Sequence, residues 1–163
     1  MTYTGLSRRA LVFGAVRMAA VGTLATLPAC AAAASEHELR VWRDEGCGCC
    51  HAWVERMLQS GQFSVTMTAE ADMLALKRRL GVPDDLISCH TALVDGFVIE
   101  GHVPVADIQR LLSERPAGIG GLAVPGMPIG SPGMEGSNMR REAFDVVAFG
   151  DAGRSVFAHY LGT

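Results

Sequence analysis

The sequence predicts an α/β fold for the region that follows an export signal. Short alternating or continuous apolar runs of strand length are separated by segments in which apolar residues recur at helical spacing. Hydrophobic residues make up 49% of the 163-residue chain, and charged residues make up 19%, below the roughly 25% of an average globular protein. This composition excludes a disordered tail, and the length indicates one domain, at residues 35–163.

Residues 1–34 are predicted to be a secretory signal peptide. Ser7-Arg8-Arg9 precedes an apolar run over 10–29, an arrangement typical of the twin-arginine type. A transmembrane anchor is the alternative, but Arg17 lies inside the run, which is rich in Ala, Gly and Thr. We therefore expect export to the periplasm.

Two processing outcomes are open at the end of this segment. Ala32-Ala33-Ala34 offers a cleavage site before Ser35, whereas Leu27-Pro28-Ala29-Cys30 resembles a lipobox that would place a lipid anchor on Cys30. In both cases Cys30 leaves the folded domain, so four of the five cysteines remain.

The charge of the exported region argues against nucleic-acid binding. Removing the three arginines of residues 1–34 leaves 11 basic against 17 acidic residues, a net charge of −6 in place of −3. A chain this acidic, without a basic stripe, is not expected to bind nucleic acid.

The first half of the domain predicts two strands, each followed by a helix. Residues 39–42 alternate as a strand, and Cys50, Trp53, Val54, Met57 and Leu58 share one face of a helix that Gly61 ends. Residues 63–68 alternate again as a second strand. Residues 70–80 are helical in composition and stop before Gly81 and Pro83.

The second half predicts a hairpin, a helix and a further hairpin. The apolar runs 91–94 and 97–100 flank Asp95-Gly96, which is a strong hairpin signal. Pro104 is predicted to open a helix whose inward face carries Ile108, Leu111 and Leu112. The order β-α-β-α-β-β-α is that of a thioredoxin-like core.

After this core, residues 116–136 form a Gly/Pro/Met-rich loop with seven glycines and four prolines. A loop of this length is usually functional or disordered. Residues 144–149 and 156–160 then flank a Gly-Asp-Ala-Gly turn and predict an added C-terminal β-hairpin.

Three cysteines, Cys47, Cys49 and Cys50, lie where the first helix is predicted to begin. The positive end of a helix dipole favours thiolates, which are both nucleophiles and metal ligands. Cys47 and Cys50 have the Cys-x-x-Cys spacing of disulfide oxidoreductases, but Cys49 is a third thiol that could attack a disulfide of its neighbours and scramble the product. The cluster therefore suits redox transfer poorly. Converging thiolates favour soft ions, and they can bridge several Cu(I) ions; zinc is the competing metal. We give little weight to three inert buried cysteines.

Cys89 is the fourth thiol, and it directly precedes the third predicted strand. By analogy with thioredoxin-like folds, that turn faces the cysteines of the first helix, so Cys89 should complete the cluster. His90 and His102 are candidate ligands or groups that orient ligands, with a weaker case for His51.

Methionines add a further class of soft donor. Met127 and Met134 lie in the Gly/Pro loop, which has no core to fill, and thioethers are Cu(I) donors that do not titrate. Met139 has less support. We expect the loop to fold over the thiols, and we assign Met57, Met67 and Met73 to packing.

Several motifs together resemble the periplasmic CopG-like copper-resistance proteins, over about residues 41–157. They are Cys47-Gly48-Cys49-Cys50 with Trp53, Gly81-Val82-Pro83, Ser88-Cys89-His90-Thr91, Glu100-Gly101-His102-Val103-Pro104, and Gly121-Leu122-Ala123-Val124-Pro125-Gly126-Met127-Pro128 with Gly133-Met134. The resemblance implies a thioredoxin-like fold with a multinuclear copper cluster on its cysteines, a role in copper tolerance, and Cu(I)/Cu(II) interconversion. Where such proteins often carry a histidine three residues after the tryptophan, this chain has Arg56.

The sequence thus predicts a periplasmic protein that sequesters or relays Cu(I) through Cys47, Cys49, Cys50 and Cys89. Its expected partners are copper ions and other periplasmic copper-handling proteins, with membrane contact only through a lipid anchor on Cys30. Two alternatives stay open, an enzyme of the thiol-disulfide oxidoreductase class and a zinc-stabilised structural module.

Overall fold

The computed structural model describes residues 37–136 and 140–163. The predicted signal peptide at 1–34, the lipobox at Cys30 and the candidate Met139 lie outside the described residues. The described strands are β1 (His37–Arg43), β2 (Phe63–Ala69), β3 (His90–Val94), β4 (Phe97–Glu100), β5 (Gly121–Ala123), β6 (Phe144–Gly150) and β7 (Gly153–Tyr160). The helices are α1 (Gly48–Gln59), α2 (Met73–Arg79) and α3 (Val105–Glu114), with a 3-10 turn η1 (Asp84–Leu86). The predicted α/β class is confirmed.

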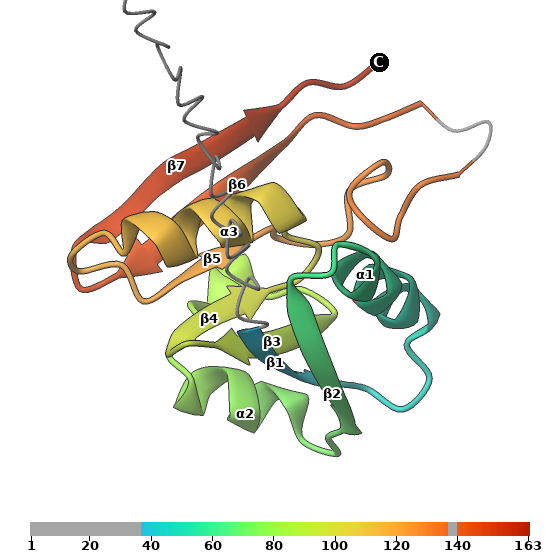
Figure 1. Cartoon of the computed structure of the whole chain (residues 1–163), viewed down its shortest axis with the longest axis horizontal. Coiled ribbons are helices and arrows are strands. Elements are labelled where there is room, and N and C mark those ends of the chain that lie inside the picture. Colours follow the sequence, from blue (N-terminus) through green and yellow to red (C-terminus); the bar gives the residue numbers. More distant parts are fainter. Residues whose placement is uncertain (1–36, 137–139) are drawn as a thin grey trace, which may run out of the picture. The chain divides into compact units, whose positions relative to one another are not determined.

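All seven strands form one mixed sheet in the order β2-β1-β3-β4-β5-β6-β7 (Figure 1). The pairs β1–β2 and β4–β5 are parallel, and the other neighbours are antiparallel. The β3–β4 hairpin turns through Asp95 and Gly96, both at positive φ (48° and 88°), as a two-residue hairpin turn requires. Thr91 faces Glu100 across this hairpin.

Side-chain alternation along the strands divides the core between the two faces of the sheet. One cluster contains Leu39, Val41, Ala92, Val94, Ile99, Leu122, Val146 and Ala148 from the strands, together with apolar residues of α1 and α3. The alternate positions Val98, Ala123, Val147 and Phe149 pack on the other face, with Leu80, Val82 and Leu86 from the segment after α2. Helices α1 and α3 therefore cover one face, and α2 covers the other (Figure 1).

The observed elements follow the predicted order, with three differences. Helix α3 begins at Val105, because Pro104 is its N-cap residue in an extended conformation rather than its first helical residue. The Gly/Pro loop contains an unpredicted strand, β5, which pairs with both β4 and β6. The terminal hairpin is longer than predicted and has a bulge between Val146 and Val147. Met57, Met67 and Met73 pack as expected.

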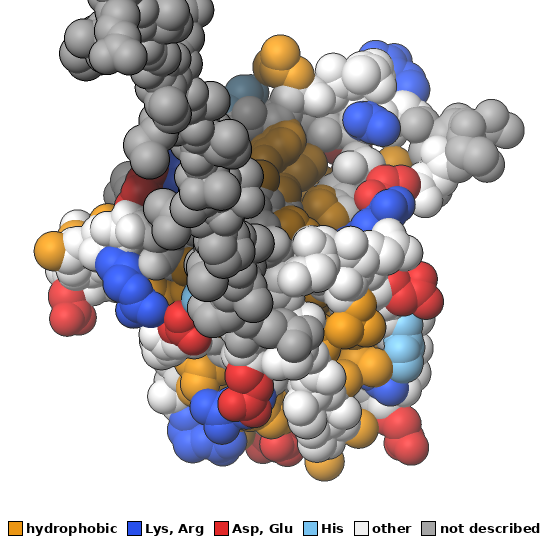
Figure 2. Space-filling view, in the orientation of Figure 1, with side chains coloured by type: hydrophobic (Ala, Val, Ile, Leu, Met, Phe, Trp, Pro, Cys, Tyr) orange, Lys and Arg blue, Asp and Glu red, His pale blue; other side chains and the backbone are white. Residues whose placement is uncertain are grey.

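On the face seen in Figure 2, acidic and basic side chains of the described residues lie beside one another in small groups. None of the helices in the described part of the chain has the length and apolar character needed to cross a membrane.

Candidate metal centre

The candidate centre lies where α1 begins, opposite the turn that leads into β3. Cys47 is the N-cap residue of α1, and its side chain makes no capping hydrogen bond. The first turn of the helix carries no acidic residue. The N-terminal N–H groups of the helix and the positive end of its dipole therefore lie beside these cysteines.

The four predicted cysteines come together, but they are not all free thiols. Cys47 and Cys50 form a disulfide, whereas Cys49 and Cys89 are free. The bridge forms although Cys49, the third thiol that the sequence places beside it, is free. A separation of three residues at the start of a helix places the two Cα atoms 5.6 Å apart, within the range that a disulfide spans.

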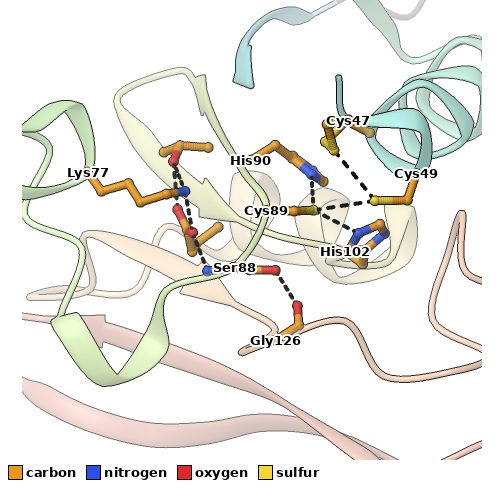
Figure 3. Close-up of polar contacts among 11 residues, drawn as sticks. Cys47, Cys49, Lys77, Ser88, Cys89, His90, His102 and Gly126 are labelled. Carbon is orange, nitrogen blue, oxygen red and sulfur yellow. Dashed lines mark hydrogen bonds and ion pairs between the residues drawn. A yellow bond between two sulfur atoms is a disulfide. The ribbon is translucent and has the colours of Figure 1, made fainter. Parts of the chain in front are cut away.

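Cys49 lies at the centre of the sulfur cluster (Figure 3). Its Sγ is 3.5 Å from Sγ of Cys47 and 3.9 Å from Sγ of Cys89. It is also 3.9 Å from Sδ of Met127. The ligand atoms of Cys47, Cys49, Cys50 and Cys89 all lie within 4.8 Å of one another, so this group could hold a metal ion. Cys50 is fully buried, whereas Cys47, Cys49 and Cys89 are partly exposed and accessible from solvent.

Cys89 belongs to a second group of donors, with His90 and His102, whose ligand atoms also lie within 4.8 Å of one another. Its Sγ is 3.1 Å from Nδ1 of His90 and 3.0 Å from Nε2 of His102 (Figure 3). On its other side, His102 donates from Nδ1 to the carbonyl oxygen of Pro132 at 2.8 Å. This bond puts the proton on Nδ1 and leaves the lone pair of Nε2 facing the sulfur, which is the usual arrangement of a metal-binding histidine.

The Cys89 sulfur faces one nitrogen of each imidazole, Nδ1 of His90 and Nε2 of His102. A cation bound between this sulfur and these two nitrogens would use their lone pairs, so the donor set fits a soft or borderline metal ion. The other ring nitrogen of His90, Nε2, is buried without a hydrogen-bond partner among the described residues and lies outside this donor set.

Burial sets the protonation of the three groups. It lowers the pKa of His90 well below its ordinary value, and repulsion between a protonated His90 and either a protonated His102 or the Lys77 charge acts in the same direction as burial. It also lowers the pKa of His102, against its hydrogen bond to Pro132. Both imidazoles are therefore neutral and can act as ligands at neutral pH. Burial, followed by the neighbouring Cys49, raises the pKa of the Cys89 thiol to about 12.

The Gly/Pro loop lies against this cluster. Met127 is half-exposed and brings its sulfur to Cys49, and the Pro132 carbonyl holds His102. Gly133 packs so closely on α1 that a Cβ there would lie 2.7 Å from the Trp53 backbone nitrogen. Met134 makes backbone hydrogen bonds within the loop, and none of the sulfur contacts described above involves it.

The remaining histidines are engaged elsewhere or lie in solvent. Nδ1 of His37 is 2.9 Å from Asp95, and Nδ1 of His159 is 2.5 Å from Asp145. His51 is exposed on α1.

Two solved structures are similar to this chain over most of its described length. Both are named copper resistance protein CopG, in forms 2 and 1, and both share 48% sequence identity with it. Each comparison covers 77% of this chain and 98% of the other, with TM-scores of 0.71 and 0.70. The chain belongs to the CopG family of copper-resistance proteins. Residues 86–134 also match a family described as "Protein of unknown function, DUF411", and no curated protein matches.

In this CopG-family chain, the DUF411 match spans Cys89, His90, His102 and the Gly/Pro loop as far as Met134. The same span contains two supporting groups that sequence reasoning missed. One is the Pro132 carbonyl, which no side-chain pattern marks. The other is Glu100, at the end of β4, which takes part in a buried polar network with Lys77 of α2. The predicted run Glu100-Gly101-His102 included Glu100 without assigning it a role.

Proposed function

We propose that this chain is a Cu(I)-binding protein of the periplasm, which sequesters or relays Cu(I) and so serves copper tolerance. The observation that carries the proposal is the convergence of Cys47, Cys49, Cys50 and Cys89 within 4.8 Å in a CopG-family chain. Thiolate, thioether and imidazole are the donors that Cu(I) prefers. Together with Met127, His90 and His102, they provide enough donors for more than one ion.

Loading begins with reduction of the Cys47–Cys50 disulfide. A dithiol reductant supplies the two electrons and two protons that convert the bridge into two thiols and is itself oxidised to a disulfide. Each thiol then loses its proton as its sulfur binds Cu(I). The Cys89 thiol is protonated at neutral pH, so its binding to the ion also releases a proton. Cu(I) affinity should therefore rise with pH.

The same pair of cysteines would allow the protein to reduce Cu(II) to Cu(I). Oxidation of the Cys47 and Cys50 thiols to the disulfide releases two protons and two electrons, which reduce two Cu(II) ions to Cu(I). Cys49, Cys89 and Met127 remain as soft donors for the ions produced. A dithiol reductant would restore the two thiols.

The fold and the export route are parts of the same proposal. The element order β-α-β-α-β-β-α and the sheet order β2-β1-β3-β4, with β3 antiparallel to its neighbours, support a thioredoxin-like core to which β5, β6 and β7 are added. The arginine pair and apolar run of residues 1–34 support export to the periplasm.

The test is anaerobic reconstitution of the reduced protein with Cu(I), followed by metal analysis of the desalted chain. We expect at least one Cu(I) per chain and a lower stoichiometry in Cys89→Ser. Less than one ion in the wild type, or an unchanged stoichiometry in the variant, would contradict the proposal. Metal analysis of protein isolated from the periplasm would show whether copper or zinc is bound there.

A thiol-disulfide oxidoreductase is the second candidate function, and one observation favours it. Cys49 lies 3.5 Å from the sulfur of Cys47 in the disulfide, within reach for thiol-disulfide exchange. This function predicts turnover with a test disulfide and inhibition by copper. The Cu(I)-binding function predicts stoichiometric copper binding without that turnover.

A further inference from the structure

A buried polar network lies on the face of the sheet opposite the thiol cluster. Lys77 reaches from α2 to Glu100, where Nζ donates to Oε1 at 2.7 Å, and to Thr91, where it donates to Oγ1 at 2.9 Å (Figure 3). Lys77 is 3% exposed, and Thr91 and Glu100 are fully buried.

This network is an unusual way to stabilise a fold. Transfer of two ionised groups from water to the interior costs several kcal/mol per ion, and an apolar pair of similar volume is often no less stable. The other hydrogen bonds of the Glu100 carboxylate indicate a role for the ion pair besides stability.

The two oxygens of Glu100 hold both ends of the segment that carries Cys89 and His90. Oε1 accepts a hydrogen bond from the backbone N–H of Ser88 at 2.6 Å, and Oε2 accepts one from the Thr91 hydroxyl at 2.7 Å. Between these two contacts lie Cys89, whose sulfur contacts Cys49 and His102, and His90, whose Nδ1 faces that sulfur.

Glu100 also lies two residues before His102. Its carboxylate therefore links the segment that carries Cys89 and His90 to the segment that carries His102. Between them, Gly101 donates from its backbone nitrogen to the His90 carbonyl at 2.9 Å. A side chain at Gly101 would collide with Ser88, so the two segments are in direct contact. Ser88 is further tied to the Gly/Pro loop, because its hydroxyl donates to the Gly126 carbonyl (Figure 3).

We propose that Glu100, held by Lys77, is a positioning residue that sets Cys89 and His90 against His102 for metal binding. This inference rests on the proposed Cu(I)-binding function. The carboxylate itself does not contact the ion; it acts through Ser88 and Thr91.

The test uses Glu100→Gln, which keeps the shape of the side chain, and measures Cu(I) affinity of the reduced protein by competition with a chromophoric chelator. Loss of an outer partner of metal ligands weakens affinity roughly 10- to 100-fold, and we expect a loss in that range. Asp107→Asn is the matched control, because Asp107 is another buried carboxylate. It lies on α3 and accepts a hydrogen bond of 2.7 Å from the Tyr160 hydroxyl. We expect it to lower the melting temperature without changing Cu(I) affinity.

Thr91 supplies a milder pair of variants. Thr91→Val removes the hydroxyl that Glu100 accepts from and should weaken Cu(I) affinity, whereas Thr91→Ser keeps a hydroxyl and should restore it. Wild-type affinity in Glu100→Gln, or equal losses of affinity in Glu100→Gln and Asp107→Asn, would overturn the inference.

A copper-independent readout separates this inference from the proposed function. In the disulfide form without metal, we expect Cys89 to be alkylated faster in Glu100→Gln than in the wild type, and at the wild-type rate in Asp107→Asn. An unchanged rate in Glu100→Gln would overturn the positioning role. Absence of Cu(I) binding in the wild type would overturn the proposed function. The alkylation rates would still decide whether Glu100 positions Cys89.

Discussion

The contact between Gly133 and α1 predicts that Gly133→Ala lifts the Gly/Pro loop off the thiol cluster. A Cβ at this position would lie 2.7 Å from the Trp53 backbone nitrogen and 3.1 Å from the Cys49 carbonyl oxygen. Because both neighbours are backbone atoms of a helix, the loop must move rather than the neighbours. Overpacking of this kind costs about 1–3 kcal/mol.

Gly126 provides a matched control in the same loop. Both glycines have positive φ, +86° at Gly133 and +67° at Gly126, so alanine strains the backbone at both positions by about 1–2 kcal/mol. A Cβ at Gly126 meets no atom within 4 Å. The difference between the two variants therefore isolates the collision with α1.

The assays are urea unfolding and the rate at which a small alkylating reagent modifies Cys49 in the disulfide form. We expect Gly133→Ala to be less stable than Gly126→Ala by about 1–3 kcal/mol and to expose Cys49 to faster alkylation. Equal unfolding free energies and equal alkylation rates in the two variants would refute the inferred packing of the loop on α1.

Three further predictions concern the two histidines of the centre, Trp53 of α1 and Met127. Burial lowers the pKa values of His90 and His102 in the folded state, so the unfolded chain takes up protons first as pH falls below the ordinary value of 6.5. The metal-free protein therefore loses stability below pH 6.5, by up to about 1.4 kcal/mol per pH unit for each histidine. Urea unfolding at a series of pH values should show this loss, and a flat profile below 6.5 would contradict it. Trp53→Phe removes a buried hydrogen bond of 2.9 Å to the Val103 carbonyl and leaves a cavity, so the melting curve should report a loss of about 1–3 kcal/mol. Met127→Ala should lower Cu(I) affinity in competition titrations while changing the unfolding free energy by no more than about 0.5 kcal/mol, since the side chain is half-exposed; wild-type affinity would remove Met127 from the donor set.

Hydrophobic periodicity was sufficient to predict most of the fold. The alternation of strands such as β1 and β2, and the apolar faces of α1 and α3, are local patterns that appear in the sequence as they do in the structure. Strand β5 could not be predicted because Gly121-Leu122-Ala123 has no strand pattern of its own. Its extended conformation comes from pairing with β4 and β6, which are distant in sequence.

The sequence predicted the positions of the thiols, but neither their oxidation state nor the buried residues that position them. The spacing of Cys47 and Cys50 permits a disulfide, yet spacing alone does not distinguish a bridge from two thiols. Nothing in the run Lys77-Arg78-Arg79 separates the buried Lys77 from its exposed neighbours. Only the packing of α2 on the sheet brings Lys77 to Glu100.

X-ray absorption spectroscopy at the copper edge, on the reduced chain loaded anaerobically with Cu(I), tests the central claim most directly. The account predicts Cu(I) bound predominantly by sulfur, with copper–copper scattering once more than one ion per chain is bound, and a loss of sulfur scattering in Cys89→Ser. Copper bound only by nitrogen and oxygen, or a spectrum that Cys89→Ser leaves unchanged, would contradict it.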